Sequence, residues 1–592
     1  MKIKYLDGSR LYYAFLAGGE AVIRDKDYLN RINVFPVPDA DTGTNLASTM
    51  RMIAQRARAS ASARHTLRSI ADAAILGARG NSGLIFAQFV YGLSREVREE
   101  CRLTTRHFAE SLRQAVNHAR RSIVTPVEGT MLTIMQDWAD AVFTERHRLA
   151  DFADLLTHSL QAAKRSLEET PRKLAVLAKA GVVDAGAKGF FDFIEGVAEF
   201  IRRGNIRTIT KTRVEAAEVP VLPHTHKNLL GRRYCAEALL SGSGLDADRI
   251  KAAIQDLGES VIVAGSDTNV RLHIHTDRPA AVFEPLDAYG HVVEVKVDDM
   301  LRQYEAGYAR RSPIALVTDS SCDLPPSLLD EHQIHVVPFL LSFGDHLYLD
   351  KLSVTPARVY ELMRTSRSRA TSSIPSPQAV QNVLSFLATH YESIIMVTIS
   401  GGLSGFHGLA QKVREEFPGK KITILDSKHI SVTQGLIVLR IAEAIRSGLS
   451  HDEIVFAAER WISSTRLWVD IRTLKYMVRS GRVSPLKGLL AKALNIKPLI
   501  ALNDQGKAVP IGKAFSRRGI MRKIIGLMRA EAANGKVWNY AIVHAAIPGR
   551  ARAYEERLAA VLGRKPAFVV DLAPVVGIHN GVGALGLGLL SD

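Results

Sequence analysis

The segment from 33 to 45 reads Asn33-Val34-Phe35-Pro36-Val37-Pro38-Asp39-Ala40-Asp41-Thr42-Gly43-Thr44-Asn45. Its prolines and glycine favour a turn, and side chains two positions apart in an extended or turning backbone project to the same side. Asp39 and Asp41 are therefore positioned to share a metal ion. Mg²⁺ is usually held by one or two carboxylates, with phosphate oxygens and water completing its shell. The alternative is an Asx-type structural turn, in which these residue types are common.

Three further small polar loops separate long amphipathic helical stretches in the N-terminal third. They read Gly77-Ala78-Arg79-Gly80-Asn81-Ser82-Gly83, Pro126-Val127-Glu128-Gly129-Thr130-Met131 and Gly181-Val182-Val183-Asp184-Ala185-Gly186-Ala187-Lys188-Gly189. The first precedes an apolar run from Leu84 to Leu93, so its backbone N–H groups and the start of the next helix would form an anion site. Each loop alone is more typical of a helix cap. The sequence contains no G-x-x-x-x-G-K-[ST] motif, so a Walker-type phosphate loop is not expected.

Together and in this order, the four segments resemble the nucleotide-binding domain of the dihydroxyacetone kinase superfamily, and more closely the N-terminal domain of bacterial fatty-acid kinases, over residues 8–203. The resemblance implies an all-α helical barrel whose loops at one end hold ATP and Mg²⁺. It makes Asp39 and Asp41 the Mg²⁺ ligands and essential to catalysis, with Ala40 between them where the family usually has glycine. The implied nucleotide-binding residues are Asn33, Thr44, Asn45, Gly80, Asn81, Ser82, Gly83, Thr130, Asp184 and Gly186.

The composition describes a globular protein of several domains. The chain has 592 residues, of which 47% are hydrophobic and 23% charged, and this length exceeds what one core usually supports. No apolar stretch is long enough to span a membrane, and the start of the chain has no apolar signal core, so we expect a cytoplasmic protein. The three cysteines lie far apart in the sequence, which argues against a disulfide framework.

The net charge of +17 raises the question of an anionic partner. The basic residues are spread along the chain without interleaved aromatic residues or a helix-turn-helix pattern, so we do not expect a nucleic-acid partner. The segment from Thr42 to Ala71 has five arginines and no acidic residue. Such a face can attract ATP phosphates or anionic lipid headgroups, so peripheral membrane contact is kept as an alternative.

Two shifts in composition indicate domain boundaries. Glu215 to Pro223 is typical of a linker, and a second break falls at Arg310 to Pro313. Between them a helix and two strands are expected, which indicates a small α+β domain. The expected domains are residues 1–205, residues 206–311 and residues 312–592.

His273 and His275 alternate along an expected strand, so they share one face, and Cys235 lies upstream. This is a spacing for metal ligands, and His224 and His226 repeat it. The alternative is a strand that carries histidines on its polar face. The region resembles the middle domain of fatty-acid kinases, and that resemblance implies that Cys235, His273 and His275 bind Zn²⁺.

From Ile314 the pattern changes to strands that alternate with helices. The expected strands Ile314 to Thr318, Ile394 to Ile399 and Lys421 to Leu425 all end in loops rich in serine and aspartate. Loops at the carboxyl ends of strands are where α/β folds place their sites. We therefore expect polar recognition of one small group in this half of the chain.

Residues 313–592 resemble the DegV family of fatty-acid-binding proteins. The matching segments are Thr318-Asp319-Ser320-Ser321, Thr371 to Pro377, Ser400 to Gly405, Asp426-Ser427, Ser480 to Ser484, Asn495 to Pro498 and His579 to Ala584. The resemblance implies two α/β subdomains that enclose an acyl chain. It implies that Ser372 or Ser373, with Ser400 or Ser404, holds the carboxylate, and that Arg482 and His579 act catalytically at the headgroup or its phosphate. Gly401 and Ile374 depart from the family's usual serine and glutamine.

These parts predict a single-chain fatty-acid kinase that uses ATP and Mg²⁺ to convert a bound fatty acid into an acyl phosphate. An acyltransferase that uses acyl phosphate would be a partner, and the two halves would act within one chain or across a homodimer. The first alternative is a kinase for dihydroxyacetone or a similar small hydroxyketone. The second is a lipid-binding regulatory protein with an inactive kinase half.

Overall fold

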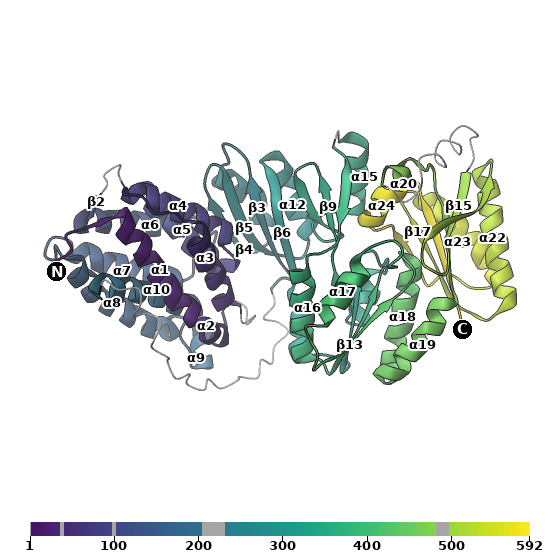
Figure 1. Ribbon diagram of the computed structural model, residues 1–592, viewed down its shortest axis with the longest axis horizontal. Helices are drawn as coiled ribbons and strands as arrows, with labels where there is room; N and C mark the ends of the chain where they lie inside the picture. Colours follow the sequence, from purple (N-terminus) through teal and green to yellow (C-terminus); the bar gives the residue numbers. More distant parts are fainter. Residues whose placement is uncertain (1, 36–40, 98–101, 204–230, 367, 481–496) are drawn as a thin grey trace. The chain divides into compact units, whose positions relative to one another are not determined.

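Amphipathic segments from Gly8 onward form the helical N-terminal region that the sequence predicts (Figure 1). The computed structural model describes residues 2–35, 41–97, 102–203, 231–366, 368–480 and 497–592. The helices of this region are α1 (Gly8–Arg24), α2 (Lys26–Arg31), α3 (Thr42–Arg56), α4 (Ala63–Gly77), α5 (Gly80–Glu96), α6 (Thr105–Arg121), α7 (Met131–Glu145), α8 (Phe152–Lys173), α9 (Ala175–Ala180) and α10 (Ala185–Arg203). Two short antiparallel strands, β1 (Tyr5–Asp7) and β2 (Arg102–Thr104), pair beside them.

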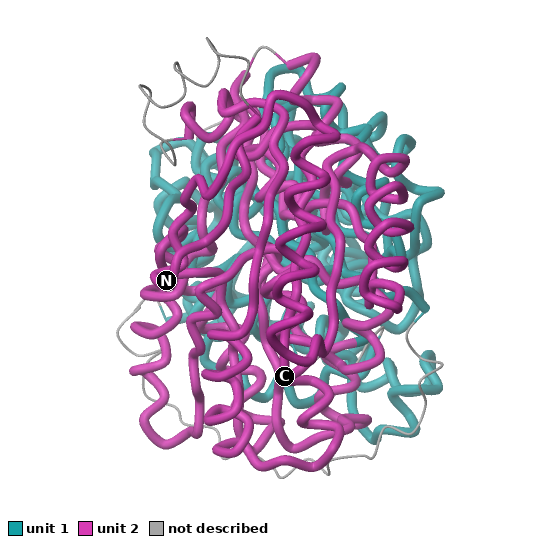
Figure 2. The backbone as a smooth tube through the Cα atoms, turned by 90° about the vertical axis from the view of Figure 1, so that its right-hand side faces the viewer, with its two compact units in different colours: residues 1–301 teal, residues 302–592 magenta. Residues whose placement is uncertain are grey.

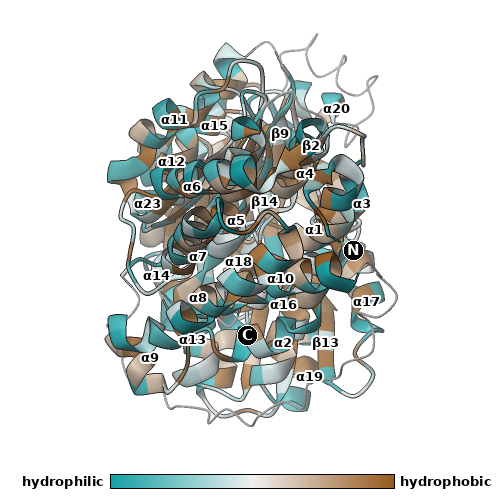
Figure 3. Ribbon diagram, turned by 90° about the vertical axis from the view of Figure 1, so that its left-hand side faces the viewer, coloured by the Kyte–Doolittle hydropathy of each residue, from teal (hydrophilic) through white to brown (hydrophobic). Residues whose placement is uncertain are grey.

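Amphipathic helices such as α8 bury one face and leave the opposite face polar, as Figure 3 shows by the mixture of colours along α8. α5 is buried on nearly all sides. Aromatic rings fill the core in edge-to-face contacts, with ring centroids 5.5 Å apart for Phe89 and Phe190 and 5.8 Å apart for Trp138 and Phe190. α1 and α10 approach closely because Gly18 leaves room for Phe193, where a Cβ would lie 2.6 Å from the ring. This packing holds the loops between the helices in place.

The middle region is the small α+β domain that the sequence predicts. Its antiparallel sheet has the strand order β4-β5-β3-β6. The elements are β3 (Tyr234–Ser241), α11 (Ala247–Ile254), β4 (Glu259–Gly265), β5 (Asn269–Thr276), α12 (Pro279–Phe283) and β6 (His291–Asp299), with 3-10 turns at Gln255–Leu257 and Glu284–Ala288. α13 (Met300–Tyr308) follows the sheet.

The chain divides into two units, residues 1–301 and residues 302–592, which Figure 2 colours separately. Unit 1 contains both the helices and the middle sheet, because edge strand β4 packs into the helical core through Ile262 and Ala264. The Val124 N–H donates to the Val261 carbonyl at 3.2 Å, and the Gly265 N–H donates to Gln88 Oε1 at 3.1 Å. The sheet is thereby fixed against α5.

Unit 2 begins with a parallel sheet in the order β13-β12-β7-β8, next to a small antiparallel sheet β10-β9-β11. The strands are β7 (Ile314–Asp319), β8 (His335–Val337), β9 (Leu340–Phe343), β10 (His346–Leu349), β11 (Ala370–Ser373), β12 (Ser393–Thr398) and β13 (Lys421–Asp426). The helices are α14 (Pro326–Glu331), α15 (Pro356–Thr365), α16 (Pro377–His390), α17 (Phe406–Arg414), α18 (Val432–Arg446) and α19 (His451–Ser463). The α/β class expected here is confirmed.

The rest of unit 2 forms a mixed sheet in the order β16-β15-β14-β19-β17-β18. Its strands are β14 (Thr465–Asp470), β15 (Lys497–Leu502), β16 (Ala508–Ala514), β17 (Val537–His544), β18 (Phe568–Asp571) and β19 (Leu585–Ser591). Its helices are α20 (Lys475–Arg479), α22 (Arg517–Asn534), α23 (Pro548–Leu562) and α24 (Pro574–Asn580). β15 and β16 form a hairpin whose turn contains Gly506 in the left-handed region, with φ of 68°. Among the described residues, no helix is both long enough and apolar enough to cross a membrane.

Candidate functional site

The starts of α3 and α5 lie side by side in unit 1. Gly80 begins α5 with φ of 56°, and a Cβ at this position would lie 2.3 Å from Asn45 Nδ2. Asn45 is buried in the first turn of α3. Thr44 is held by Asn30, whose side chain accepts from the Thr44 N–H and donates to Thr44 Oγ1, both at 3.0 Å. Asp41 is the N-cap residue of α3, and its carboxylate makes no capping bond to that helix. Asp39 lies outside the described residues.

A second group of predicted residues meets where α7 and α10 begin. A Cβ at Gly186 would lie 3.1 Å from Ser82 Oγ, 3.3 Å from Asp184 Oδ1 and 3.4 Å from Met131 Cε. Thr130 is the N-cap residue of α7, and its hydroxyl donates to the Val127 carbonyl at 2.8 Å. The loops that begin α5, α7 and α10 are therefore neighbours.

The buried carboxylate of Asp184 accepts hydrogen bonds from backbone N–H groups. Burial raises its pKa to about 7, against hydrogen bonds from the backbone N–H groups of Ala187, Gly186 and Met131, which lower it. The Ala187 N–H donates to Asp184 Oδ1 at 2.7 Å. One carboxyl group thus caps α10 and also contacts the start of α7. The other predicted residues are placed as follows: Asn33 is buried at the end of α2, and Asn81, Ser82 and Gly83 form the first turn of α5.

Cys235, His273 and His275 come together on one face of the middle sheet. Their ligand atoms all lie within 4.8 Å of one another, and Cys235 Sγ is 3.7 Å from His273 Nδ1. β3 and β5 pair so that Cys235 lies opposite His275. Burial and then His273 lower the pKa of His275 to about 3, so its imidazole is neutral at pH 7 and can bind a metal. One thiol and two buried imidazoles form a donor set that fits Zn²⁺. His224 and His226 lie outside the described residues.

Glu237 is the residue at this cluster that the sequence reasoning missed. It lies opposite His273 in the β3–β5 pair, is 2% exposed, and its Oε1 is 3.4 Å from His273 Nδ1. The same Oε1 accepts the Gly80 N–H at 2.7 Å. Burial alone would raise the pKa of Glu237, but the hydrogen bond to His273, the charge of Lys296 and the Gly80 N–H together hold it below its usual range. The available signal was strand alternation, which puts Glu237 on the same face as Cys235.

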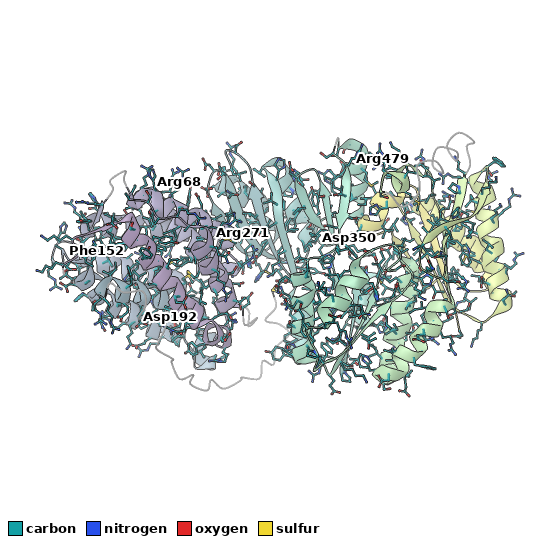
Figure 4. All side chains as sticks on the ribbon, in the orientation of Figure 1. Arg68, Phe152, Asp192, Arg271, Asp350 and Arg479 are labelled. Carbon is teal, nitrogen blue, oxygen red and sulfur yellow. The ribbon has the colours of Figure 1, made fainter. Side chains whose placement is uncertain are left out.

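Ion pairs strengthen the contact between this sheet and the helices. Arg271, labelled in Figure 4, is 1% exposed and donates to the carbonyl oxygens of Ile75 at 3.1 Å and Leu76 at 2.8 Å, near the end of α4. It also bonds Glu294 Oε2 at 2.8 Å, and Arg79 bonds the same oxygen at 3.0 Å. A cation at a helix C-terminus satisfies carbonyl groups that lack helical partners. The loop before α5 is therefore fixed from the sheet side. Burial is the main cause that raises the pKa of Cys235, and the charges of Glu237, Asp298 and Asp41 raise it further.

Unit 2 contains a cavity of about 280 Å³ between its two large sheets. Most of the side chains that line it are aliphatic, and they come from both subdomains, for example Ile399, Leu467 and Val576. Ile374, at the position where the resembled family usually has glutamine, adds another apolar surface. The aliphatic lining fits an apolar ligand.

Polar residues gather at one part of this cavity. Ser372 Oγ and His579 Nε2 are 2.9 Å apart, and Ser373 and Ser404 also line the wall. Ser400 is fully buried but is not part of the lining, because its hydroxyl donates to the Gly506 carbonyl at 2.9 Å and supports the β15–β16 turn. Of the two alternatives Ser400 and Ser404, the second faces the cavity.

Two polar side chains in the lining, Ser321 and Asn580, received no role from the sequence. Both residues lie in segments that match the DegV family, next to residues that were assigned to the site, and this position in the sequence was the available signal. Ser321 donates to Gln434 Oε1 at 3.0 Å, and its N–H donates to the buried carboxylate of Asp319 at 3.0 Å. Arg482 lies outside the described residues.

Family comparisons divide the chain into three matched regions. Residues 36–199 match the DAK2 domain, residues 231–307 match the FakA-like middle domain of fatty acid kinases, and residues 313–592 match the uncharacterised proteins of the DegV family. The chain therefore carries a DAK2 domain, a FakA-like middle domain and a DegV-family domain. The first two domains suggest a kinase, and the DAK2 domain implies nucleotide binding.

Two staphylococcal relatives of the chain are described as uncharacterised proteins. An uncharacterised protein of Staphylococcus epidermidis is 29% identical over 313 residues, which are 51% of this chain and 56% of that protein. An uncharacterised protein of Staphylococcus saprophyticus is 28% identical over the same length and shares of both chains. The chain thus spans about half the length of the curated relatives it matches.

Solved structures of DegV proteins align with the C-terminal half. A fatty-acid-binding DegV family protein from Thermus thermophilus is 27% identical, with a TM-score of 0.45, and the alignment covers 47% of this chain and 99% of that one. DegV from Bacillus subtilis, described as a fatty acid binding protein, is 25% identical with a TM-score of 0.44, covering 48% of this chain and 100% of that one.

Proposed function

We propose that this protein is a fatty-acid kinase, which transfers the γ-phosphate of ATP to the carboxylate of a fatty acid and yields acyl phosphate and ADP. One observation carries the proposal. A single chain joins a DAK2 domain to a cavity with aliphatic walls and a polar group of serines and His579. The domains would be residues 1–205 for the nucleotide, residues 206–311 for a zinc site and residues 312–592 for the fatty acid.

The cavity supports an acyl ligand on energetic grounds. Each buried methylene contributes about 0.8 kcal/mol, so a long acyl chain would gain on the order of 10 kcal/mol before ordering costs. The carboxylate would meet the polar group at Ser372, Ser373 and Ser404. His579, which contacts Ser372, would lie beside the reacting oxygen, and Arg482 would add positive charge there. This arrangement shields the tail and presents the headgroup.

The loops of unit 1 support the nucleotide half of the proposal. The start of α5 would receive phosphate oxygens at the first turn that contains Asn81, Ser82 and Gly83. Asp39 and Asp41 would hold Mg²⁺, which offsets the repulsion between the phosphate groups and the incoming carboxylate. The cluster of Cys235 with the buried His273 and His275 would hold Zn²⁺ close to these loops.

The reaction needs no general base. A carboxyl group has a pKa of about 4.3 and is ionised at pH 7. A carboxylate oxygen forms a bond to the γ-phosphorus while the bond from that phosphorus to the bridging oxygen of ADP breaks, and no proton is transferred. The protein therefore contributes positioning and charge stabilisation. The product is a reactive mixed anhydride, which an acyltransferase that uses acyl phosphate would consume.

The test uses the purified full chain. Mass spectrometry of extracted lipid should detect a fatty acid, and incubation with Mg²⁺-ATP and hydroxylamine should yield fatty acyl hydroxamate together with ADP. Asp41→Asn should retain the lipid and form no hydroxamate. ATP turnover on dihydroxyacetone, with no bound lipid, would favour a hydroxyketone kinase. Bound lipid with no turnover in any condition would leave a lipid-binding protein and contradict the kinase assignment.

A further inference from the structure

The carboxylate of Glu237 lies between two candidate sites that are far apart in the sequence. Its Oε1 is 2.7 Å from the Gly80 nitrogen at the start of α5 and 3.4 Å from His273 Nδ1 in the Cys235, His273 and His275 cluster. The side chain is 2% exposed. Within the described part of the chain, its other oxygen, Oε2, has no hydrogen-bond partner.

The Gly80 contact places a carboxylate where the proposed function requires a phosphate. The N–H groups of the first helical turn have no helical acceptor, and they bind either an anionic side chain or an anionic ligand. The Glu237 oxygen, 2.7 Å from the Gly80 nitrogen, is the hydrogen-bond acceptor for that N–H. A nucleotide phosphate bound at the start of α5 would therefore compete with the Glu237 carboxylate for this backbone N–H.

The contact with His273 places the same carboxylate beside the candidate metal-binding cluster, where it could act as a further ligand. A tetrahedral zinc site needs four ligands, and the cluster supplies three. Glu237 lies opposite His273 in the β3–β5 pair, so its side chain already points to the face that carries the cluster. In this structure the same Oε1 contacts both the Gly80 N–H and His273 Nδ1.

We propose that Glu237 is a residue shared by the two sites, which caps α5 at Gly80 when the metal cluster is empty and turns to the cluster when a divalent cation is bound. Metal binding then opens the Gly80 N–H to nucleotide phosphate. The inference rests on the proposed nucleotide site and adds its regulation. By linkage, nucleotide must raise the affinity for metal by the same factor as metal raises the affinity for nucleotide.

The test measures binding rather than turnover, on the full chain by calorimetry. Mg²⁺-ADP is titrated into protein stripped of metal with a chelator that is then removed, and into the same protein loaded with one equivalent of Zn²⁺. We expect Zn²⁺ to tighten Mg²⁺-ADP binding about tenfold, and Mg²⁺-ADP to tighten Zn²⁺ binding by the same factor.

Two variants separate the positions of the carboxylate. Glu237→Ala removes the competitor, so metal-free protein should bind Mg²⁺-ADP as tightly as zinc-loaded wild type. Glu237→Gln keeps an acceptor for the Gly80 N–H but loses the charge that attracts a cation, so its Mg²⁺-ADP affinity should stay weak with and without Zn²⁺. Glu294→Gln is the matched control: Glu294 pairs with Arg79 beside the same loop, and this variant should keep the zinc effect.

Each alternative result has a definite reading. Equal Mg²⁺-ADP affinity in metal-free and zinc-loaded wild type, with Zn²⁺ shown to be bound, overturns this inference and leaves the kinase proposal intact. Wild type that binds no Zn²⁺ overturns it as well. No Mg²⁺-ADP binding in any form, Glu237→Ala included, overturns the proposed nucleotide site and this inference with it. A zinc effect that persists in Glu237→Ala assigns the coupling to another residue and overturns the role of Glu237.

Discussion

The cavity of unit 2 is enclosed by many aliphatic side chains that come from two sheets, whereas the loop cluster of unit 1 depends on single polar groups at the starts of α3, α5 and α10. In the cavity, neighbouring residues such as Leu467, Val469 and Ile471 all contribute apolar surface to the same wall. In the loop cluster, the Gly80 N–H has one partner atom and Asp184 has three assigned donors. A site formed by many aliphatic contacts should tolerate single substitutions, whereas a site formed by a few specific hydrogen bonds should not.

The largest effect should follow Asp41→Asn, because the amide keeps the shape of the side chain and loses the charge that attracts Mg²⁺. We expect Mg²⁺-dependent ATP turnover to fall by about 100-fold or more, with an unchanged melting temperature. Asp27→Asn is the matched control, since Asp27 lies on the neighbouring helix α2 with its side chain 79% exposed. Near-normal turnover in Asp41→Asn would contradict the metal assignment.

His579→Ala tests the polar part of the cavity against its apolar walls. His579 contacts Ser372 but contributes little area to a bound tail. Acyl phosphate formation should fall by about 10- to 100-fold, whereas the amount of co-purified lipid should stay the same. His346→Ala, on β10 and away from the lining, should change neither quantity. If His579→Ala loses the lipid and forms acyl phosphate normally, we have misplaced the headgroup.

Gly80→Ala tests the close packing between the start of α5 and Asn45 in α3. A methyl group would meet Asn45 Nδ2 at 2.3 Å and would sit on a backbone with φ of 56°. We expect a loss of about 1–3 kcal/mol in the free energy of unfolding and weaker Mg²⁺-ADP binding. Gly181→Ala is the control, because Gly181 has φ of 66° and no atom within 4 Å of the added Cβ. Equal losses in the two variants would show that strain alone, without the contact to Asn45, explains the effect.

The smallest functional effect should follow Leu467→Ala. Leu467 is one aliphatic residue among many in the lining, so fatty-acid dissociation measured by transfer to vesicles should quicken by only about fivefold, equivalent to roughly one buried methylene. Leu558→Ala is the control: this residue is fully buried in another core cluster and should lower stability without changing dissociation. Complete loss of lipid from a folded Leu467→Ala variant would contradict the claim that the cavity tolerates single changes.

The contrast also explains what the sequence predicts and what it does not. Helix and strand patterns depend on local periodicity, and they were sufficient for α5, β5, β7 and β12. The grouping of Cys235 with His273 followed from alternation plus resemblance. Glu237 was missed because its significance comes from Gly80, which lies 157 positions away, and no local pattern reports such a contact.

The two serines of one loop show the same limit at shorter range. Ser400 and Ser404 are equivalent in a pattern of glycines and serines. Only the β15–β16 turn, which brings the Gly506 carbonyl to Ser400, distinguishes the buried hydroxyl from the one that lines the cavity. A hairpin placed by tertiary packing therefore selects between residues that the sequence leaves equal.

The carboxyl group of Asp184 binds a proton more tightly once it is buried in folded unit 1. Its pKa of about 7 in the folded protein exceeds the ordinary value of 3.8, so the folded state binds this proton more tightly than the unfolded chain does. The stabilisation is complete below about pH 4 and is lost as the pH rises through about 7. Near pH 6 this carboxyl group should accordingly take up a proton when the chain folds. The same group accepts hydrogen bonds from the first turns of α7 and α10, so its ionisation near pH 7 acts directly on the starts of both helices.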